Sequence, residues 1–120
     1  MEAYKEALSE NVAIVSIMWA NNETGTLFPV EKLASMAKAA GALFHTDAVQ
    51  AVGKIPMNLA ETDIDFLSLS GHKLHAPKGV GALYCRRGAR YRPLMRGGHQ
   101  ERNRRAGTEN APGIIALGKA

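Results

Sequence analysis

The sequence predicts an α/β fold with a mostly parallel sheet and flanking helices. Residues 12–18 form a continuously apolar, β-branched run, which is typical of a parallel strand covered on both faces. Pro29 and Gly41 bracket a segment whose apolar side chains recur at helical spacing, and proline before and glycine after a helix are its usual boundaries. Strand patterns alternate with helical ones along 120 residues, a length that fits a single domain.

The other elements follow in chain order. The first ten residues place Ala3, Ala7 and Leu8 on one face of a short amphipathic helix. Further apolar runs predict strands at residues 42–44, 64–69 and 80–85. Residues 90–98 are expected to pair with the last of these strands as a hairpin-like partner. Residues 48–52 predict a helical turn. Residues 109–120 predict a final helix.

Cysteine content and hydropathy exclude several classes of protein. Cys85 is the single cysteine, so the chain has neither an internal disulfide nor a cysteine-rich zinc site. The longest apolar run, residues 12–20, is far shorter than the roughly 20 residues of a membrane span. No signal peptide is visible in the first ten residues. We therefore expect a cytoplasmic protein that does not bind membranes.

Charge is divided unevenly between the two parts of the chain. Residues 1–85 hold six lysines and nine carboxylates, a net charge of −3, whereas residues 86–120 hold eight arginines, one lysine and two glutamates, a net charge of +7. Such a basic block can bind nucleic acid, an anionic cofactor or a neighbouring subunit. Tyr91 is its single aromatic residue between Arg86 and Arg105, and prolines and glycines interrupt it, so we expect no nucleic-acid partner.

Polar clusters follow three of the predicted strands. They are residues 21–23, 45–47 and 70–73. In open α/β sheets, ligands bind outside the carboxyl ends of the strands, and parallel strands bring these ends to one edge. The three clusters together therefore predict a binding pocket at that edge.

Lys73 and Asp47 are the candidate reactive groups of this edge. A lysine that follows a buried strand, beside Gly71 and His72, loses hydration, which favours the neutral amine that forms Schiff bases with carbonyls. The alternative is an ordinary solvated lysine. Asp47, 26 residues earlier, could pair with the protonated ring nitrogen of pyridoxal phosphate (PLP), or it could cap the turn at residues 48–52.

Ser70, Gly71 and His72 could bind an anion through a hydroxyl, a backbone N–H and an imidazole, although they could also form a plain polar turn. A rival interpretation is a metal hydrolase whose ligands come from His45, Asp47, His72 and His75. No HExxH or comparable signature accompanies these residues, so we expect no metal.

Four segments of the sequence resemble a known family. They are VSIMWANNETGTLFP, FHTDAVQAVGK, LSLSGHKLHAPKGVGALYCRRG and RGGHQERNRRAGTEN. In this order they closely resemble cysteine desulfurases, nearest to the NifS-like, nitrogen-fixation branch of the PLP-dependent class-V aminotransferase family. The resemblance runs from about Tyr4 to Ala120. It implies the large domain of a fold-type-I PLP-dependent transferase.

The resemblance assigns roles around the cofactor ring. Lys73 matches the catalytic lysine that holds PLP and moves protons on the substrate carbon. Asp47 matches the partner of the ring nitrogen, and Gln50 matches the donor to the ring hydroxyl. Asn22 matches a residue beside that hydroxyl and the bound amino acid. The implied cofactor is pyridoxal 5'-phosphate.

The resemblance also assigns the phosphate ligands and the partners. Ser70 and His72, with Gly71 between them, match phosphate-binding positions, and Thr108 matches a phosphate ligand given across a homodimer interface. An arginine-rich subunit edge beside an anionic cofactor would explain the basic block. The implied reaction converts L-cysteine to L-alanine, and an iron–sulfur scaffold protein receives the sulfur, in a process related to nitrogenase.

The resemblance covers only the central part of the PLP-binding large domain, residues 1–120. We therefore expect a fragment that lacks the N-terminal segment and the C-terminal domain, with its nucleophilic cysteine, and that is inactive alone. Cys85 lies twelve residues after Lys73 in a predicted strand, where a small buried side chain is the simpler interpretation. The alternative is a stand-alone remnant that binds PLP or a partner without catalysis.

Overall fold

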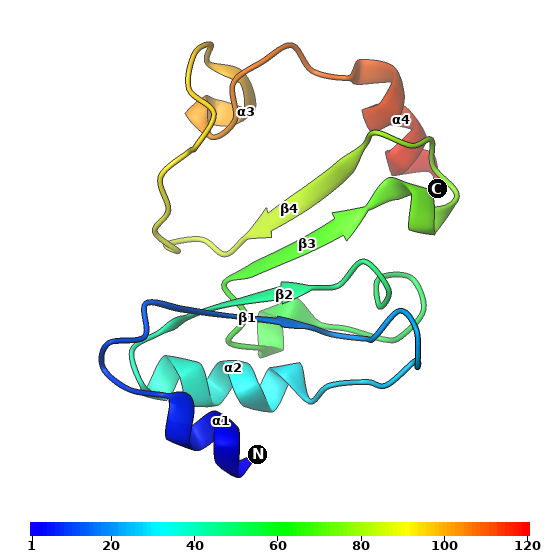
Figure 1. The fold of residues 1–120 in the computed structure, drawn as a ribbon. Coiled ribbons are helices and arrows are strands. Elements are labelled where there is room, and N and C mark those ends of the chain that lie inside the picture. Colours follow the sequence, from blue (N-terminus) through cyan, green and yellow to red (C-terminus); the bar gives the residue numbers. More distant parts are fainter.

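A four-stranded sheet organises the computed structural model, which describes residues 1–120 (Figure 1). The strands are β1 (Ile14–Met18), β2 (Leu43–Asp47), β3 (Phe66–Ser70) and β4 (Gly81–Cys85), in the order β1-β2-β3-β4. β1, β2 and β3 are parallel, and β4 is antiparallel to β3. The predicted α/β class with a mostly parallel sheet is confirmed.

Helices and short turns connect the strands. The α-helical elements are α1 (Glu2–Ala7), α2 (Val30–Ala39), α3 (Gln100–Asn103) and α4 (Ala111–Lys119), and 3-10 turns occur at η1 (Leu59–Glu61) and η2 (Gly71–Leu74). α3 is a single turn in which Glu101 and Arg102 have positive φ angles of 49° and 58°. None of these helices is long and apolar enough to cross a bilayer.

The core lies between α2 and one face of the sheet. Leu33, Ala34 and Ala37 of α2 are buried together with Phe44 of β2 and Leu67 of β3. Alanines on the inner face of α2 let the helix approach the strands closely, and β-branched and aromatic side chains fill the space between them. α1 is attached to this layer by the Tyr4 hydroxyl, which donates to the Leu33 carbonyl at 2.8 Å.

The opposite face of the sheet is largely exposed. Paired residues of neighbouring strands share a face, and the pairs Ser16–His45 and Met18–Asp47 lie on this one. Ile14 at its β1 edge is 51% exposed, although its side chain is apolar. The run at residues 12–18, predicted to be covered on both faces, is therefore covered by helix on one face only.

Two further details differ from the sequence-based expectation. Residues 90–98 form no strand, because Pro93 lacks a donor and Gly97 and Gly98 favour turns, and β4 pairs with β3 instead. The cluster at residues 45–47 is the second half of β2 and not a loop after it, so only Asp47 stands at the strand end. The arginine-rich segment leaves β4 and extends away from the sheet before it reaches α4 (Figure 1).

Candidate functional site

The carboxyl ends of β1, β2 and β3 meet at one edge of the sheet, at the right in Figure 1. The loop after β1 is organised by Asn21, whose Oδ1 accepts hydrogen bonds from the Glu23 and Thr24 N–H groups, both at 2.9 Å. Asn22 is exposed in this loop, and its Nδ2 donates to Glu23 Oε1 at 2.7 Å. The amide predicted to lie near the ring hydroxyl is therefore accessible at this edge.

Asp47 ends β2 with its carboxylate exposed. Its Oδ1 accepts the Val49 N–H at 2.9 Å, so the predicted capping role is confirmed, and the second carboxylate oxygen has no hydrogen bond within the chain. The Asp47 carbonyl also accepts the Trp19 N–H at 2.8 Å, which fixes the backbone to the end of β1. Gln50 follows in the turn, where its Oε1 accepts from Lys54 Nζ at 3.1 Å.

The turn η2 brings two of the predicted anion ligands together. Ser70 Oγ and His72 Nδ1 lie 2.7 Å apart in a hydrogen bond. Gly71 between them is buried, and its N–H, which we expected to be available to an anion, donates to the Val80 carbonyl at 2.9 Å. A Cβ at this position would lie 2.9 Å from Val80 Cγ1, so glycine is needed here for close packing.

Lys73 lies in η2 with its side chain exposed. The chain contains two ion pairs, Lys5–Glu2 and Lys38–Asp63, so no carboxylate engages the Lys73 amine. Thr108 lies in the exposed segment between α3 and α4 and makes no hydrogen bond to this edge of the sheet. Within one chain, the structure therefore gathers all of the predicted site residues at the edge except Thr108.

Asp47, His72 and Lys73 are exposed at this edge in this chain. Four cavities of about 260–630 Å³ lie elsewhere, and none of them is lined by Asp47 or Lys73. The rival metal ligands do not converge, because His45 bonds to Ser16 and Ser68 while His72 bonds to Ser70. What the edge offers is an amine, a carboxylate, a hydroxyl and an imidazole accessible from solvent.

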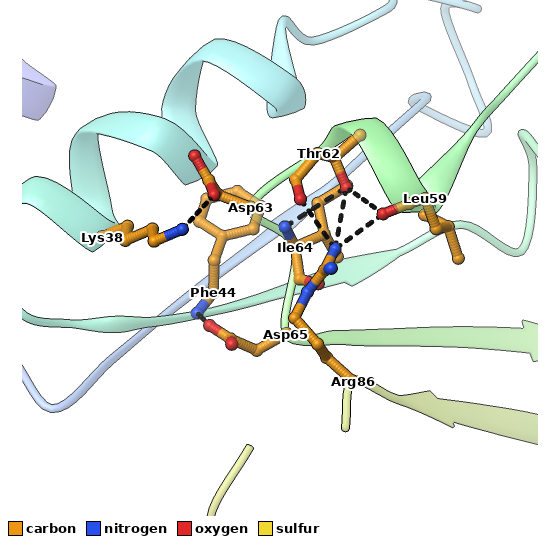
Figure 2. Close-up of polar contacts among 8 residues, drawn as sticks. All are labelled: Lys38, Phe44, Leu59, Thr62, Asp63, Ile64, Asp65 and Arg86. Atoms are coloured by element: carbon orange, nitrogen blue, oxygen red, sulfur yellow. Dashed lines mark hydrogen bonds and ion pairs between the residues drawn. The ribbon is translucent and has the colours of Figure 1, made fainter. Parts of the chain in front are cut away.

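Arg86 has a role that sequence reasoning missed. It lies directly after β4, at the sheet end opposite Lys73, and Figure 2 shows its guanidinium among backbone carbonyls. Nε donates to the Ile64 carbonyl at 2.8 Å, and Nη2 donates to those of Leu59 and Thr62 at 2.7 and 2.8 Å. Its partners are 22–27 residues away in the sequence, so no local pattern reveals them. Arg86 joins η1 and the segment before β3 to the end of β4 through these hydrogen bonds, so its guanidinium is engaged within the chain.

The other contacts in Figure 2 hold the same end of the sheet. Asp65 Oδ2 accepts the Phe44 N–H at 2.8 Å, and Lys38 Nζ lies 2.5 Å from Asp63 Oδ1. These groups join α2, β2 and the segment before β3. The amino-terminal end of the sheet is thus a structural cluster, and the candidate site lies at the other end.

Comparison with known proteins gives consistent matches over the whole chain. The aminotransferase class-V family matches residues 1–120. A cysteine desulfurase of Gluconacetobacter diazotrophicus is 77% identical over 120 residues, and the cysteine desulfurase NifS of Azotobacter vinelandii is 68% identical over 120 residues. In both cases the match covers 100% of this chain and 30% of the relative, so the chain spans about a third of the length of its curated relatives.

Solved structures share the fold. A NifS-like protein superimposes with a TM-score of 0.92 at 47% identity, covering 98% of this chain and 33% of that one. The structure described as SspA in complex with cysteine also gives a TM-score of 0.92, at 42% identity, and covers 98% of this chain and 35% of its own. With a family match over its full length and these relatives, the chain belongs to the aminotransferase class-V family.

Proposed function

We propose that residues 1–120 form the central part of the PLP-binding large domain of a cysteine desulfurase, an enzyme that converts L-cysteine to L-alanine and transfers the sulfur. The observation that carries the proposal is the gathering of Lys73, Asp47 and the Ser70–His72 pair at one sheet edge. The 77% identity to a cysteine desulfurase supports the choice of reaction.

The donor set at the edge fits the chemistry of PLP. The cofactor presents an aldehyde, a phosphate and a ring nitrogen, and the edge presents an exposed amine at Lys73, a hydroxyl with an imidazole at Ser70 and His72, and a carboxylate at Asp47. Bound PLP supplies an electron sink that stabilises negative charge on the substrate carbon. We therefore assign the edge as the place where this group is held.

Each residue at the edge has a defined role in this proposal. Lys73 holds the cofactor and then carries a proton to and from the substrate carbon. Asp47 accepts a hydrogen bond from the protonated ring nitrogen and so keeps it charged. Ser70 and His72 donate to the phosphate, and their mutual hydrogen bond of 2.7 Å keeps both side chains near each other before it binds.

The remaining polar residues complete the set. Gln50 donates to the ring hydroxyl, and Asn22 lies beside that hydroxyl and the amino-acid substrate. Thr108 donates to the phosphate of a partner subunit in a homodimer, which is consistent with its position away from the edge within one chain. The exposed arginines of the basic block would then lie at that subunit interface, beside an anionic cofactor.

Cys85 does not accept the sulfur in this proposal. It pairs with Phe66 at the beginning of β3, whereas η2 follows Ser70 at the end of that strand. Four residue steps at about 3.4 Å each place it about 14 Å from the edge. The sulfur-accepting cysteine belongs to the part of the relatives that this chain does not match. We therefore propose that the chain alone binds the cofactor without completing the reaction.

The partners and setting follow from the same assignment. We propose L-cysteine as the substrate, an iron–sulfur scaffold protein as the recipient of the sulfur, and the cytoplasm as the location. The similarity to NifS of Azotobacter vinelandii supports a place in nitrogenase-related iron–sulfur cluster assembly.

A PLP titration followed by visible absorption tests the proposal. The wild-type protein and Lys78→Ala, which changes another exposed lysine five residues further along, should both show a saturable band. Lys73→Ala should lose it. Equal binding by Lys73→Ala would contradict the proposal. L-cysteine added to the loaded wild-type chain should yield no L-alanine, and its appearance would overturn the proposed inactivity of the isolated chain.

A further inference from the structure

A row of three polar side chains crosses the exposed face of the sheet, one from each parallel strand. Ser16 Oγ of β1 lies 2.7 Å from His45 Nδ1 of β2, and His45 Nε2 lies 3.2 Å from Ser68 Oγ of β3. Both ring nitrogens are therefore engaged, each with a hydroxyl that can donate or accept. The imidazole joins three strands through side chains, in addition to the backbone ladder.

His45 is half-buried in this row. Burial lowers the pKa of the imidazole below its usual 6.5, and the Asp47 carboxylate raises it by a smaller effect. Asp47 is the charged group that acts on this pKa. The ring is consequently neutral at pH 7, with one nitrogen donating and the other accepting.

The row lies close to Asp47, because His45 precedes it by two residues on β2. His45 and Asp47 are two residues apart on one strand, so their side chains leave the same face of the sheet. The Asp47 carbonyl is bonded to the Trp19 N–H at 2.8 Å, and the next amide, that of Ala48, is bonded to the Ser68 carbonyl at 3.0 Å. Ser68 thus holds the end of β2 with its backbone and His45 with its side chain.

This geometry has a consequence for the carboxylate. The position of Asp47 depends on the spacing of β1 and β3 on either side of β2 at the edge, and the row fixes the spacing of β1 and β2 two residue pairs earlier, at Ser16 and His45. We propose that His45 is a positioning residue for Asp47, acting through its hydrogen bonds to Ser16 and Ser68. This inference rests on the proposed function, in which Asp47 binds the ring nitrogen of the cofactor.

A double-mutant cycle on PLP affinity tests the inference. His45→Leu removes both hydrogen bonds and should weaken PLP binding about tenfold, the size of effect typical when a residue that orients a ligand group is lost. Asp47→Asn should weaken it at least as much. Because His45 acts through Asp47, the double variant should bind no more weakly than Asp47→Asn alone. Additive losses, or unchanged affinity in His45→Leu, would overturn the inference.

Smaller substitutions test the same hydrogen bonds in case His45→Leu does not fold. Ser16→Ala and Ser68→Ala each remove one hydrogen bond and should each weaken binding by a smaller factor, whereas Ser35→Ala on the exposed face of α2 should not change it. Urea unfolding of each variant separates stability from affinity, since a purely structural role would alter stability alone. If wild type and Lys73→Ala bind PLP equally, the proposed function fails and this inference fails with it. If PLP binding depends on Lys73 but the PLP affinity of Ser16→Ala and Ser68→Ala equals that of wild type, the inference about His45 is overturned and the proposed function stands.

Discussion

Ser70 and His72 lie 2.7 Å apart, Oγ to Nδ1, across the turn that carries Lys73. The hydrogen bond joins the last residue of β3 to the middle of η2. It therefore joins two expected phosphate donors in the turn that also carries Lys73. This preformed pair reduces the cost of ordering the side chains when an anion binds.

Replacement of Ser70 tests this pair. Ser70→Ala removes one donor and leaves His72 without its partner, so PLP affinity should fall about tenfold, close to the value of one hydrogen bond to a charged group. The visible-band titration measures it. Ser35→Ala, on the surface of α2, is the matched control and should bind as wild type does. Unchanged affinity in Ser70→Ala would argue against phosphate binding at this turn.

Arg86 should contribute strongly to stability. Arg86→Ala leaves the carbonyls of Leu59, Thr62 and Ile64 without this donor, and we expect the free energy of unfolding to fall by about 3 kcal/mol. Arg87→Ala changes the adjacent, exposed arginine and should alter it by less than about 0.5 kcal/mol. Urea denaturation of both variants makes the comparison. Similar losses in the two would contradict the assigned role.

Thr46 carries a buried hydroxyl without a partner. Its side chain is fully buried on the α2 face of β2, and Oγ1 makes no hydrogen bond. Thr46→Val keeps the shape and removes the unpaired group, so stability should rise by about 1 kcal/mol. Thr62→Val is the opposite case, because Thr62 Oγ1 donates to the Leu59 carbonyl at 3.2 Å. Thermal or urea unfolding should show changes of opposite sign, and a loss of stability in Thr46→Val would contradict this account.

His45 should make stability depend on pH. Its pKa is lowered in the folded protein by burial, so the unfolded chain takes up a proton at a higher pH than the folded one. The unfolded state then binds more protons below about pH 6.5, and stability falls as pH decreases through 6.5 toward the lower folded-state pKa. From about one unit above pH 6.5 the group has no effect, because it is then neutral in both states.

The comparison variant for this prediction is His45→Gln, which keeps polar contacts and does not titrate. Urea unfolding at several pH values between about 5 and 8 should show a smaller loss of stability at the acidic end for the variant than for wild type. Identical pH profiles for the two proteins would show that His45 is not held neutral by the fold.

The sequence predicts the parallel strands and α2 because their signals are local. Pro29 and Gly41 bound the helix, and apolar runs mark β1 and β3. His45 was assigned to a polar cluster after a strand because the exposed face of β2 carries polar residues, and a single sequence does not reveal which face lacks a helix. The role of Arg86 depends on contacts across 22–27 residues, which no local pattern encodes.

The candidate site was predictable in part. The positions of Asp47 and Lys73 at one edge follow from parallel strands, which the apolar runs indicate. The engaged amide of Gly71 was not predictable, because it depends on the return of the chain at Val80. The predicted loss of hydration at Lys73 was wrong for this chain, since the Lys73 side chain is exposed.

The most direct test of the account is to locate the lysine that reacts with PLP. The purified protein is incubated with PLP and reduced with borohydride, and peptide mass spectrometry then identifies the labelled residue. We predict labelling at Lys73 alone. Label distributed over exposed lysines such as Lys5, Lys32 and Lys38, without preference for Lys73, would contradict it.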